Sequence, residues 1–242
     1  MNGDPIGGRW TRVLAESALI VFSILLAFGI EAGWSQRNER VAELEALQGL
    51  RRDFDENLLR LADSRDEHVQ IRDAAIRVLA LTGPAPDEVP QDIVMDSLVM
   101  TLIFAPKVFA VTATYDALIA SGGIDLLQGS PLRRELAVWS ASIADLGEEE
   151  REAFAQMDQR LLPFLWDYVP IVTLDINVLA EYSDVDIGPS RFPSRYPELL
   201  RSRRFENHVE ERMNSSIKSI SSIAEVEAST RRVLQLVDEQ IR

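Results

Sequence analysis

An uninterrupted apolar run near the N-terminus constrains the fold of this chain more than any other feature. Residues 17–30 read SALIVFSILLAFGI and include no charged side chain. With the mainly apolar residues around it, from Val13 to Trp34, the run reaches about 20 residues, the length that an α-helix needs to cross the hydrocarbon core of a bilayer. Trp10 and Trp34 would lie roughly 36 Å apart on such a helix, close to the two headgroup layers that tryptophan favours. The pattern predicts a single transmembrane helix over residues 13–34.

Aromatic and charged residues mark both edges of this segment. The residues expected to anchor the helix at the two membrane interfaces are Trp10, Arg12, Trp34 and Arg37. Glu16 and Glu31 lie just inside the edges, where each carboxylate must reach the interface, be protonated or face a partner. The free amino terminus gives the side before the span a slight excess of positive charge, which favours an N-in orientation. We therefore expect a single-pass protein of a bacterial inner membrane with its large domain in the periplasm.

Three other interpretations of the N-terminal run stay open at this point. A basic start, an apolar centre and the small residues Ala27 and Gly29 also suit a cleaved signal peptide. A helix buried in the core of a soluble protein is a second alternative. Gly29 and Gly33 form a G-x-x-x-G pair, which either lets two membrane helices approach closely or is incidental. Against cleavage, the helical pattern continues through Trp34 without a break.

Composition narrows the range of partners. The chain has 242 residues and a formal net charge of −14, with Asp+Glu 39 against Lys+Arg 25. Such an acidic surface argues against nucleic acid as a partner, because phosphate binding needs a basic surface. The sequence contains no cysteine, which excludes disulfides, thiolate nucleophiles and cysteine-ligated zinc. We expect no cofactor, and as partners the lipid bilayer together with another protein or a second copy of this chain.

Hydrophobic periodicity after residue 34 predicts helices almost throughout. Between residues 35 and 81 apolar residues recur at three- and four-residue steps, and a segment with three prolines and a glycine, Gly83–Pro90, ends the pattern. Further helices are expected over 91–104, over 112–121, from Ser130-Pro131 to an end or kink at Pro163, and from Pro197 to Ile241. Residues 171–180 suit a strand or a short helix, and residues 181–197 suit a loop.

Each long helix carries one apolar stripe that another element must cover. The expected stripes are Leu44, Leu47, Phe54, Leu58, Leu61, Ala75 and Leu79 in the first helix, and Phe205, Val209, Met213, Ile217, Ile220, Ala224, Val233 and Val237 in the last. His68 is one of several polar residues that interrupt the first stripe. Such stripes favour an antiparallel bundle. The expected fold is all-α, with an N-terminal tail (1–12) and a transmembrane helix (13–34) that continues into an elongated antiparallel helical bundle (35–242).

Two stretches of the sequence resemble a known group of proteins. The run ALIVFSILLAFGIEAGWSQRNER followed by LRRDFDENL, and the later stretch TYDALIASGGIDLL, are similar to two signatures of an uncharacterised bacterial family of single-pass membrane proteins. Glu16, Trp34 and Asn38 match positions of the first signature, whereas Ala32 and Gly33 stand where polar amides are more usual. The resemblance covers about half of the chain. It implies an N-terminal membrane helix and a helical domain, and it implies no particular activity.

Few groups of residues suggest chemistry. His68 and His208, together with Asp66 or Glu211, could form a metal site, although neither histidine lies in a recognised metal motif. The stretch from Asp184 to Gly188 resembles part of a calcium loop without its closing glutamate, and a turn is the simpler interpretation. The acidic run 148–150 suits a solvated helix face better than acid–base catalysis.

The most suggestive polar group surrounds a predicted turn. Its members are Tyr115, Asp116, Ser121, Gly122 and Gly123. The two glycines are expected to end the short helix 112–121 in a left-handed conformation. The group forms either a pocket for a partner or ligand, or a cap that packs the short helix against the bundle.

No catalytic signature stands out from this sequence. We therefore expect a membrane-anchored helical module for interaction, scaffolding or sensing that is not an enzyme. The alternative is a helical-bundle ligand receptor or enzyme with its site near Tyr115–Gly123. That alternative requires a pocket of several hundred Å³ with convergent polar groups.

Overall fold

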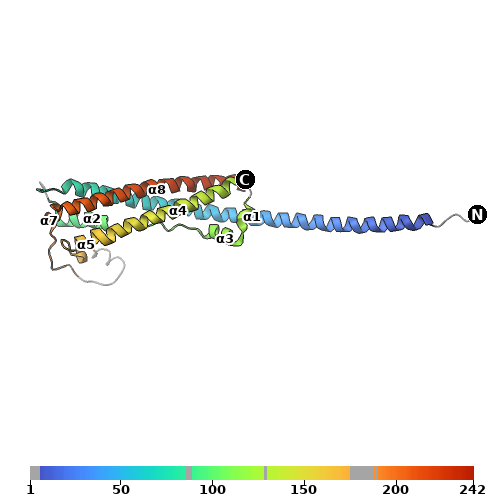
Figure 1. The fold of residues 1–242 in the computed structure, drawn as a ribbon, viewed down its shortest axis with the longest axis horizontal. Coiled ribbons are helices and arrows are strands. Elements are labelled where there is room, and N and C mark those ends of the chain that lie inside the picture. Colours follow the sequence, from blue (N-terminus) through green and yellow to red (C-terminus); the bar gives the residue numbers. More distant parts are fainter. Residues whose placement is uncertain (1–5, 86–88, 128–129, 175–187, 189) are drawn as a thin grey trace, which may run out of the picture.

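The structure, a computed structural model, describes residues 6–85, 89–127, 130–174, 188 and 190–242. Within these ranges every regular element is a helix, which confirms the all-α prediction. Figure 1 shows an elongated bundle of helices, from one end of which a single helix projects toward the N-terminus.

Three long helices form the frame of the bundle. α1 (Ile6–Leu81) runs unbroken from the projecting part into the bundle. The sequence predicted that the N-terminal helix continues in this way. α8 (Arg203–Ile241) lies antiparallel beside the second half of α1, and α4 (Ser130–Gln156) lies along α8 (Figure 1). The helical bundle is therefore confirmed. α8 runs antiparallel to both α1 and α4, so α1 and α4 run in the same direction as each other.

Two shorter helices pack against α1. α2 (Asp92–Ile103) and α3 (Ala113–Ser121) agree closely with the predicted segments, and a 3₁₀ turn, η1 (Gly123–Leu126), follows α3. α3 approaches α1 closely at Gly49, where an added Cβ would lie only 2.8 Å from Oγ1 of Thr114. The close approach explains why a helix former does not occupy this position of α1.

Apart from Gly49 and Ala74 on α1, and Glu227 and Ser229 on α8, the buried residues of these two helices recur alternately every four and every three positions. On α1 they are Glu43, Leu47, Leu50, Phe54, Asn57, Leu61, Ser64, His68, Ile71, Ala75 and Val78. On α8 they are Phe205, Val209, Arg212, Ser216, Ser219, Ile223, Val226, Thr230, Val233 and Val237. A mean step of about 3.5 residues is the repeat of coiled coils, in which supercoiling keeps one narrow stripe of each helix on its neighbour.

The stripe predicted for α8 is wrong in its middle part. Ile217 is 47% exposed and Ala224 is exposed as well, whereas Arg212, Ser216 and Ser219 are buried. The prediction assigned apolar residues to the buried stripe. In this part of α8 the buried positions are polar, so the prediction chose their apolar neighbours instead. On α1 three predicted leucines are only partly buried: Leu44, Leu58 and Leu79.

The helical stretch that begins with α4 does not end at Pro163. α4 continues through one π-helical turn, η2 (Met157–Leu161), into α5 (Leu162–Leu165). Pro163 has no N–H to donate to the carbonyl four residues earlier, so the regular α-helical pattern fails here. The π-helical turn contains one residue more than an α-helical turn, and this shifts the order in which buried and exposed positions follow one another. Its first and last residues are both buried as a result, and Arg160 stays exposed.

The final helical stretch is divided, which the sequence interpretation missed. α7 (Tyr196–Leu200) contains Pro197 in its first turn, and α8 begins only after a break at Arg201 and Ser202. Ser202 has an extended backbone, and its Oγ accepts a hydrogen bond from the N–H of Phe205 at 3.4 Å. Serine is a preferred N-cap residue, so it starts a new helix here. Of the predicted segment 171–180, residues 171–174 are helical and the others lie outside the described residues.

An extended segment, residues 104–112, joins α2 to α3, and we call it the strap. It has no strand beside it, so its backbone groups need other partners. Asn57 supplies two of them, because its Nδ2 donates to the carbonyl of Val111 at 2.9 Å and its Oδ1 accepts from the Val111 N–H at 2.7 Å. Arg60 donates to the carbonyl of Phe109 at 2.6 Å. Side chains of α1 thus hold the strap against the bundle.

The apolar core is divided into two clusters along the bundle. One cluster gathers around α2, α5, α7 and the start of α8, with Leu200 and Val78 among its members. The other gathers around α3, α4 and the last part of α8, and Trp139 lies at its centre. Trp139 contacts the ring of Phe54 at 4.5 Å and donates to Oγ1 of Thr230 at 3.1 Å. The seam positions between the two clusters are polar.

Candidate functional site

Five buried polar residues lie in the seam between the two apolar clusters, and we call them the polar layer. They are Ser64 and His68 on α1, and Arg212, Ser216 and Ser219 on α8. Each is no more than 5% exposed. Burial of polar groups is unfavourable unless they are hydrogen bonded, so apolar packing does not explain why these residues stand in the seam.

Arg212 is a buried cation that caps another helix. Its Nε donates to the carbonyl of Leu102 at 2.9 Å, and its Nη2 donates to the carbonyl of Phe104. These carbonyls close the C-terminal end of α2, where positive charge is favourable. Among the residues that the structure describes, no carboxylate forms an ion pair with Arg212. Burial lowers the pKa of its guanidinium to about 10, so the side chain stays charged at neutral pH.

His68 is buried without a hydrogen-bond partner. It is 1% exposed, and neither Nδ1 nor Nε2 has a partner among the described residues. The hydroxyl oxygens of Ser64 and Ser216 likewise have none. Burial and, to a lesser degree, the positive charge of Arg212 lower the pKa of the His68 imidazole to about 4. His68 is therefore neutral at physiological pH.

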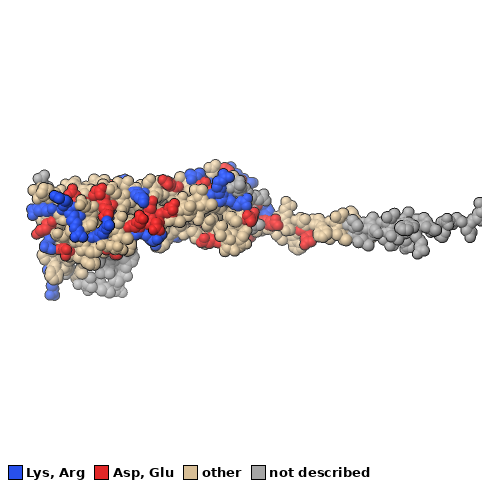
Figure 2. Space-filling view, viewed as in Figure 1, with Lys and Arg blue, Asp and Glu red and all other residues tan. Residues whose placement is uncertain are grey.

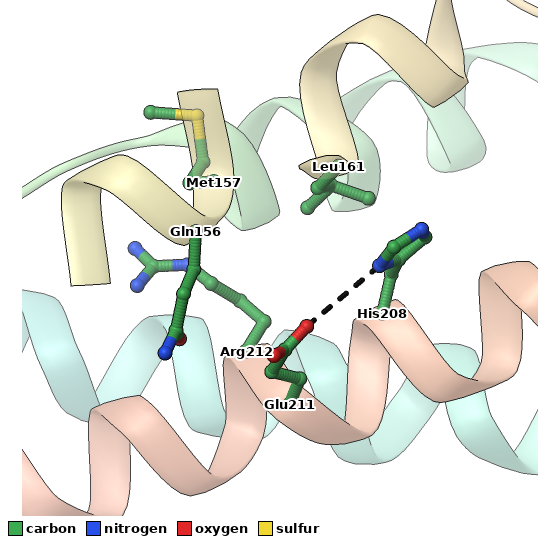
Figure 3. Close-up of a pocket in the computed structure, with 6 residues that line it drawn as sticks. All are labelled: Gln156, Met157, Leu161, His208, Glu211 and Arg212. Atoms are coloured by element: carbon green, nitrogen blue, oxygen red, sulfur yellow. Dashed lines mark ion pairs between the residues drawn. The ribbon is translucent and has the colours of Figure 1, made fainter. Parts of the chain in front are cut away.

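A second histidine stands at the edge of the polar layer, one turn from Arg212 on α8. Figure 3 shows His208 beside Glu211, with 3.8 Å between His208 Nδ1 and a carboxylate oxygen. Glu211 is also paired with Arg160 of the π-helical turn at 2.6 Å. Burial, followed by the charge of Arg204, lowers the pKa of His208, and Glu211 opposes this shift.

The space around these side chains limits what they can do. The hollow drawn in Figure 3, where α8 faces the π-helical turn, has a volume of only about 10 Å³. A cavity of that size holds about one water molecule. This hollow is thus too small for a substrate. Each proton taken up by a histidine would add positive charge close to Arg212.

The predicted turn around Tyr115 is present, although only one of its two glycines is left-handed, and Gly123 begins the 3₁₀ turn η1 instead. Gly122 has φ 70°, the left-handed conformation that ends α3. Ser121 donates to the carbonyl of Ala117 at 2.7 Å. Asp116 is exposed and accepts a hydrogen bond from Thr112 at 2.6 Å. These contacts are local to α3 and stabilise it.

The side chain of Tyr115 faces the bundle. It is partly buried, and its ring meets Trp139 edge to face with centroids 6.2 Å apart. Gly123 is also buried, whereas Ser121 and Gly122 are exposed. The five residues share one turn and do not converge on a common point.

Side chains of the projecting part of α1 are exposed from residue 22 onward. Glu31, Trp34 and Arg37 are among them, and Trp34 is 69% exposed. The side chains of Trp10, Arg12 and Glu16 lie outside the described ones. Within the described residues, no helix combines the length and the hydropathy needed to cross a membrane.

Other groups singled out in the sequence do not assemble. Among the described residues, no three His, Cys, Asp or Glu side chains are grouped so that they could hold a metal ion. The calcium-loop resemblance at 184–188 falls mostly outside the described residues. In the acidic run 148–150, Glu150 is not solvated as expected but buried, and it accepts a hydrogen bond from the Val108 N–H at 2.9 Å. Burial raises the pKa of Glu150.

The sequence interpretation missed Arg212, Ser64, Ser216 and Ser219 as seam residues. A signal for them exists, because all four fall on the alternating three- and four-residue repeat that the apolar seam positions define. Extending that repeat through polar positions would have placed them inside the bundle.

Comparison with known proteins gives no assignment: no family model, no curated protein and no solved structure matches this chain.

Proposed function

We propose that this protein is a membrane-anchored helical module, in which residues 13–34 cross the inner membrane and the bundle stands in the periplasm to contact a partner. One observation carries the proposal. The projecting part of α1 presents large apolar side chains that no part of the bundle covers: Leu19, Phe22, Ile24, Leu25, Leu26, Phe28, Ile30 and Trp34, each between 50% and 69% exposed.

The distribution of these side chains around the helix favours lipid over a protein partner. Successive residues of an α-helix are about 100° apart, because a turn contains 3.6 residues. The apolar residues between Phe22 and Ile30 therefore point in all directions. A protein partner would cover one face and leave the others in water, whereas a bilayer surrounds the helix.

The anchor can be tested by extraction of membranes with alkaline carbonate. We expect the full-length protein to stay in the membrane fraction with an intact N-terminus. The double variant Leu25→Arg/Phe28→Arg should be released, because each arginine near the centre of a span disfavours insertion by about 2.5–3.5 kcal/mol. Ile93→Arg, at a 74% exposed position of α2, is the matched control and should behave as wild type. Release of the wild-type protein, or a mature chain that begins after Gly29, would contradict the anchor.

The orientation needs a separate measurement. An alkaline phosphatase fused after Arg242 should be active, since this enzyme matures only in the periplasm. An inactive phosphatase fusion together with an active cytoplasmic reporter at the same position would reverse the orientation and leave the anchor itself in place.

A further inference from the structure

The end of the bundle farthest from the projecting helix differs in charge from the rest of the chain. α5, α7 and the start of α8 lie there (Figure 1). Between residues 190 and 204 the sequence has five arginines and one carboxylate, although the whole chain has a net charge of −14. Figure 2 shows Lys and Arg side chains gathered at this end of the molecule. We call it the distal surface.

A hollow opens in the distal surface beside exposed aromatic rings. Its volume is about 440 Å³, and its lining includes Trp166, Tyr168, Pro170, Phe192, Pro193 and Arg195, together with one carboxylate, Asp167. Trp166 is 62% exposed and Phe192 is 80% exposed. Large apolar side chains this exposed are unfavourable in water, and side by side they mark a contact site.

The floor and wall of the hollow are held in place without a ligand. The backbone N–H of Arg195 donates to the carbonyl of Tyr168 at 2.8 Å, and its guanidinium donates to the carbonyl of Asp167. The same guanidinium lies 5.4 Å from the centroid of the Tyr168 ring. Val169, the residue after Tyr168, is 1% exposed and belongs to the neighbouring apolar cluster. A binding site that is already ordered loses little conformational entropy when it is filled.

We propose that the distal surface binds a protein segment with an apolar anchor residue and acidic neighbours. The hollow suits a large apolar side chain. Arg195 in its lining and the other arginines of residues 190–204 suit carboxylates, which guanidinium groups bind in pairs of hydrogen bonds. Trp, Tyr and Arg are also the residue types enriched where protein contacts are strongest. The inference extends the proposed function, because an anchor at the opposite end would hold this surface away from the bilayer.

Binding can be measured with the full chain in non-ionic detergent by fluorescence anisotropy. The probes are short synthetic peptides with Leu and Phe at the centre and Glu on both sides, and matched peptides with Gln or Lys in place of Glu. We expect the acidic peptide to bind at least about tenfold more tightly than the Gln peptide. The difference should shrink as salt is added, because salt screens charges at an exposed surface.

Variants locate the site. Phe192→Ser, and the charge reversals Arg201→Glu and Arg203→Glu, should each weaken binding of the acidic peptide by about tenfold or more. Arg134→Glu reverses an exposed charge on α4 and should leave binding unchanged. Circular dichroism of each variant should show the helix content of the wild type, since all four side chains are exposed.

Several outcomes would overturn the proposal. They are equal binding of the three peptides, binding that does not respond to the distal variants, and binding of anionic vesicles or single-stranded oligonucleotides in preference to every peptide. Binding that appears only after the carboxylates of residues 175–187 are changed to amides would assign the surface to the chain itself. The assay is made in micelles and does not depend on whether residues 13–34 cross a bilayer, so it can fail or succeed independently of the anchor.

Discussion

Replacing His68 by leucine should remove a pH dependence from the stability of the bundle. In the folded protein His68 is buried beside Arg212, and its pKa is about 4. In the unfolded chain an exposed histidine has a pKa of about 6.5. The unfolded state therefore binds the proton more tightly. The contribution of His68 to stability is fully present above pH 6.5 and is lost as the pH falls toward 4.

The size of the effect follows from the two pKa values. One pKa unit corresponds to about 1.4 kcal/mol, so the full difference amounts to about 3 kcal/mol. Between pH 7 and pH 5 the loss is about 2 kcal/mol. A domain of this kind has a total stability of about 5–15 kcal/mol, so the loss is large enough to measure. His208, whose pKa is also lowered, adds a change of the same sign.

The assay is urea unfolding of wild type and His68→Leu in the same detergent, followed by circular dichroism at several pH values. The unfolding free energy of the wild type should fall by about 2 kcal/mol more than that of the variant between pH 7 and pH 5. Carboxylates titrate in both proteins and cancel in the comparison. Because the chain has only 2 histidines, NMR can follow both rings directly. Parallel stability profiles, or a His68 ring that titrates near its ordinary pKa in the folded protein, would refute the reasoning.

Two further predictions concern packing against α1. Gly49→Ala should destabilise the bundle by about 1–3 kcal/mol in urea unfolding, because the new methyl group meets Thr114. Gly147→Ala is the matched control within α4 and should stabilise by about 0.5–1 kcal/mol, since nothing lies near its added Cβ. Asn57→Ala should destabilise by about 2–3 kcal/mol, because both backbone groups of Val111 lose their partner. Equal melting of Asn57→Ala and wild type would mean that water replaces the amide and that the strap is not held as described.

Helix limits could be predicted from the sequence because they depend on local signals. Gly83 and the prolines after it end α1, and Gly122 ends α3, each through the conformation of its own backbone. The break before α8 was missed for the opposite reason. Ser202 competes with a continuous helix, and nothing within a few residues of Ser202 decides between the two outcomes.

The seam could be predicted only where it is apolar. Arg212 enters the bundle because the carbonyls at the end of α2 accept its hydrogen bonds, and that partner is more than one hundred residues away in the chain. The strap and the distal hollow also depend on contacts between residues far apart in the chain, as the Arg195–Tyr168 backbone hydrogen bond illustrates. Periodicity reports which face of a helix is covered, but not which element covers it.

The continuity of α1 gives the protein a mechanical property. If residues 13–34 sit in a bilayer, no loop or hinge separates them from Glu43–Leu81, the part of the same helix that forms the seam. Any change in the tilt of this helix within the membrane must then tilt the whole bundle by the same angle. The seam portion extends for roughly 58 Å at 1.5 Å per residue, so a tilt of about 10° would displace the distal end by about 10 Å. The position of the distal surface above the membrane would then depend on the tilt angle of residues 13–34 within the bilayer.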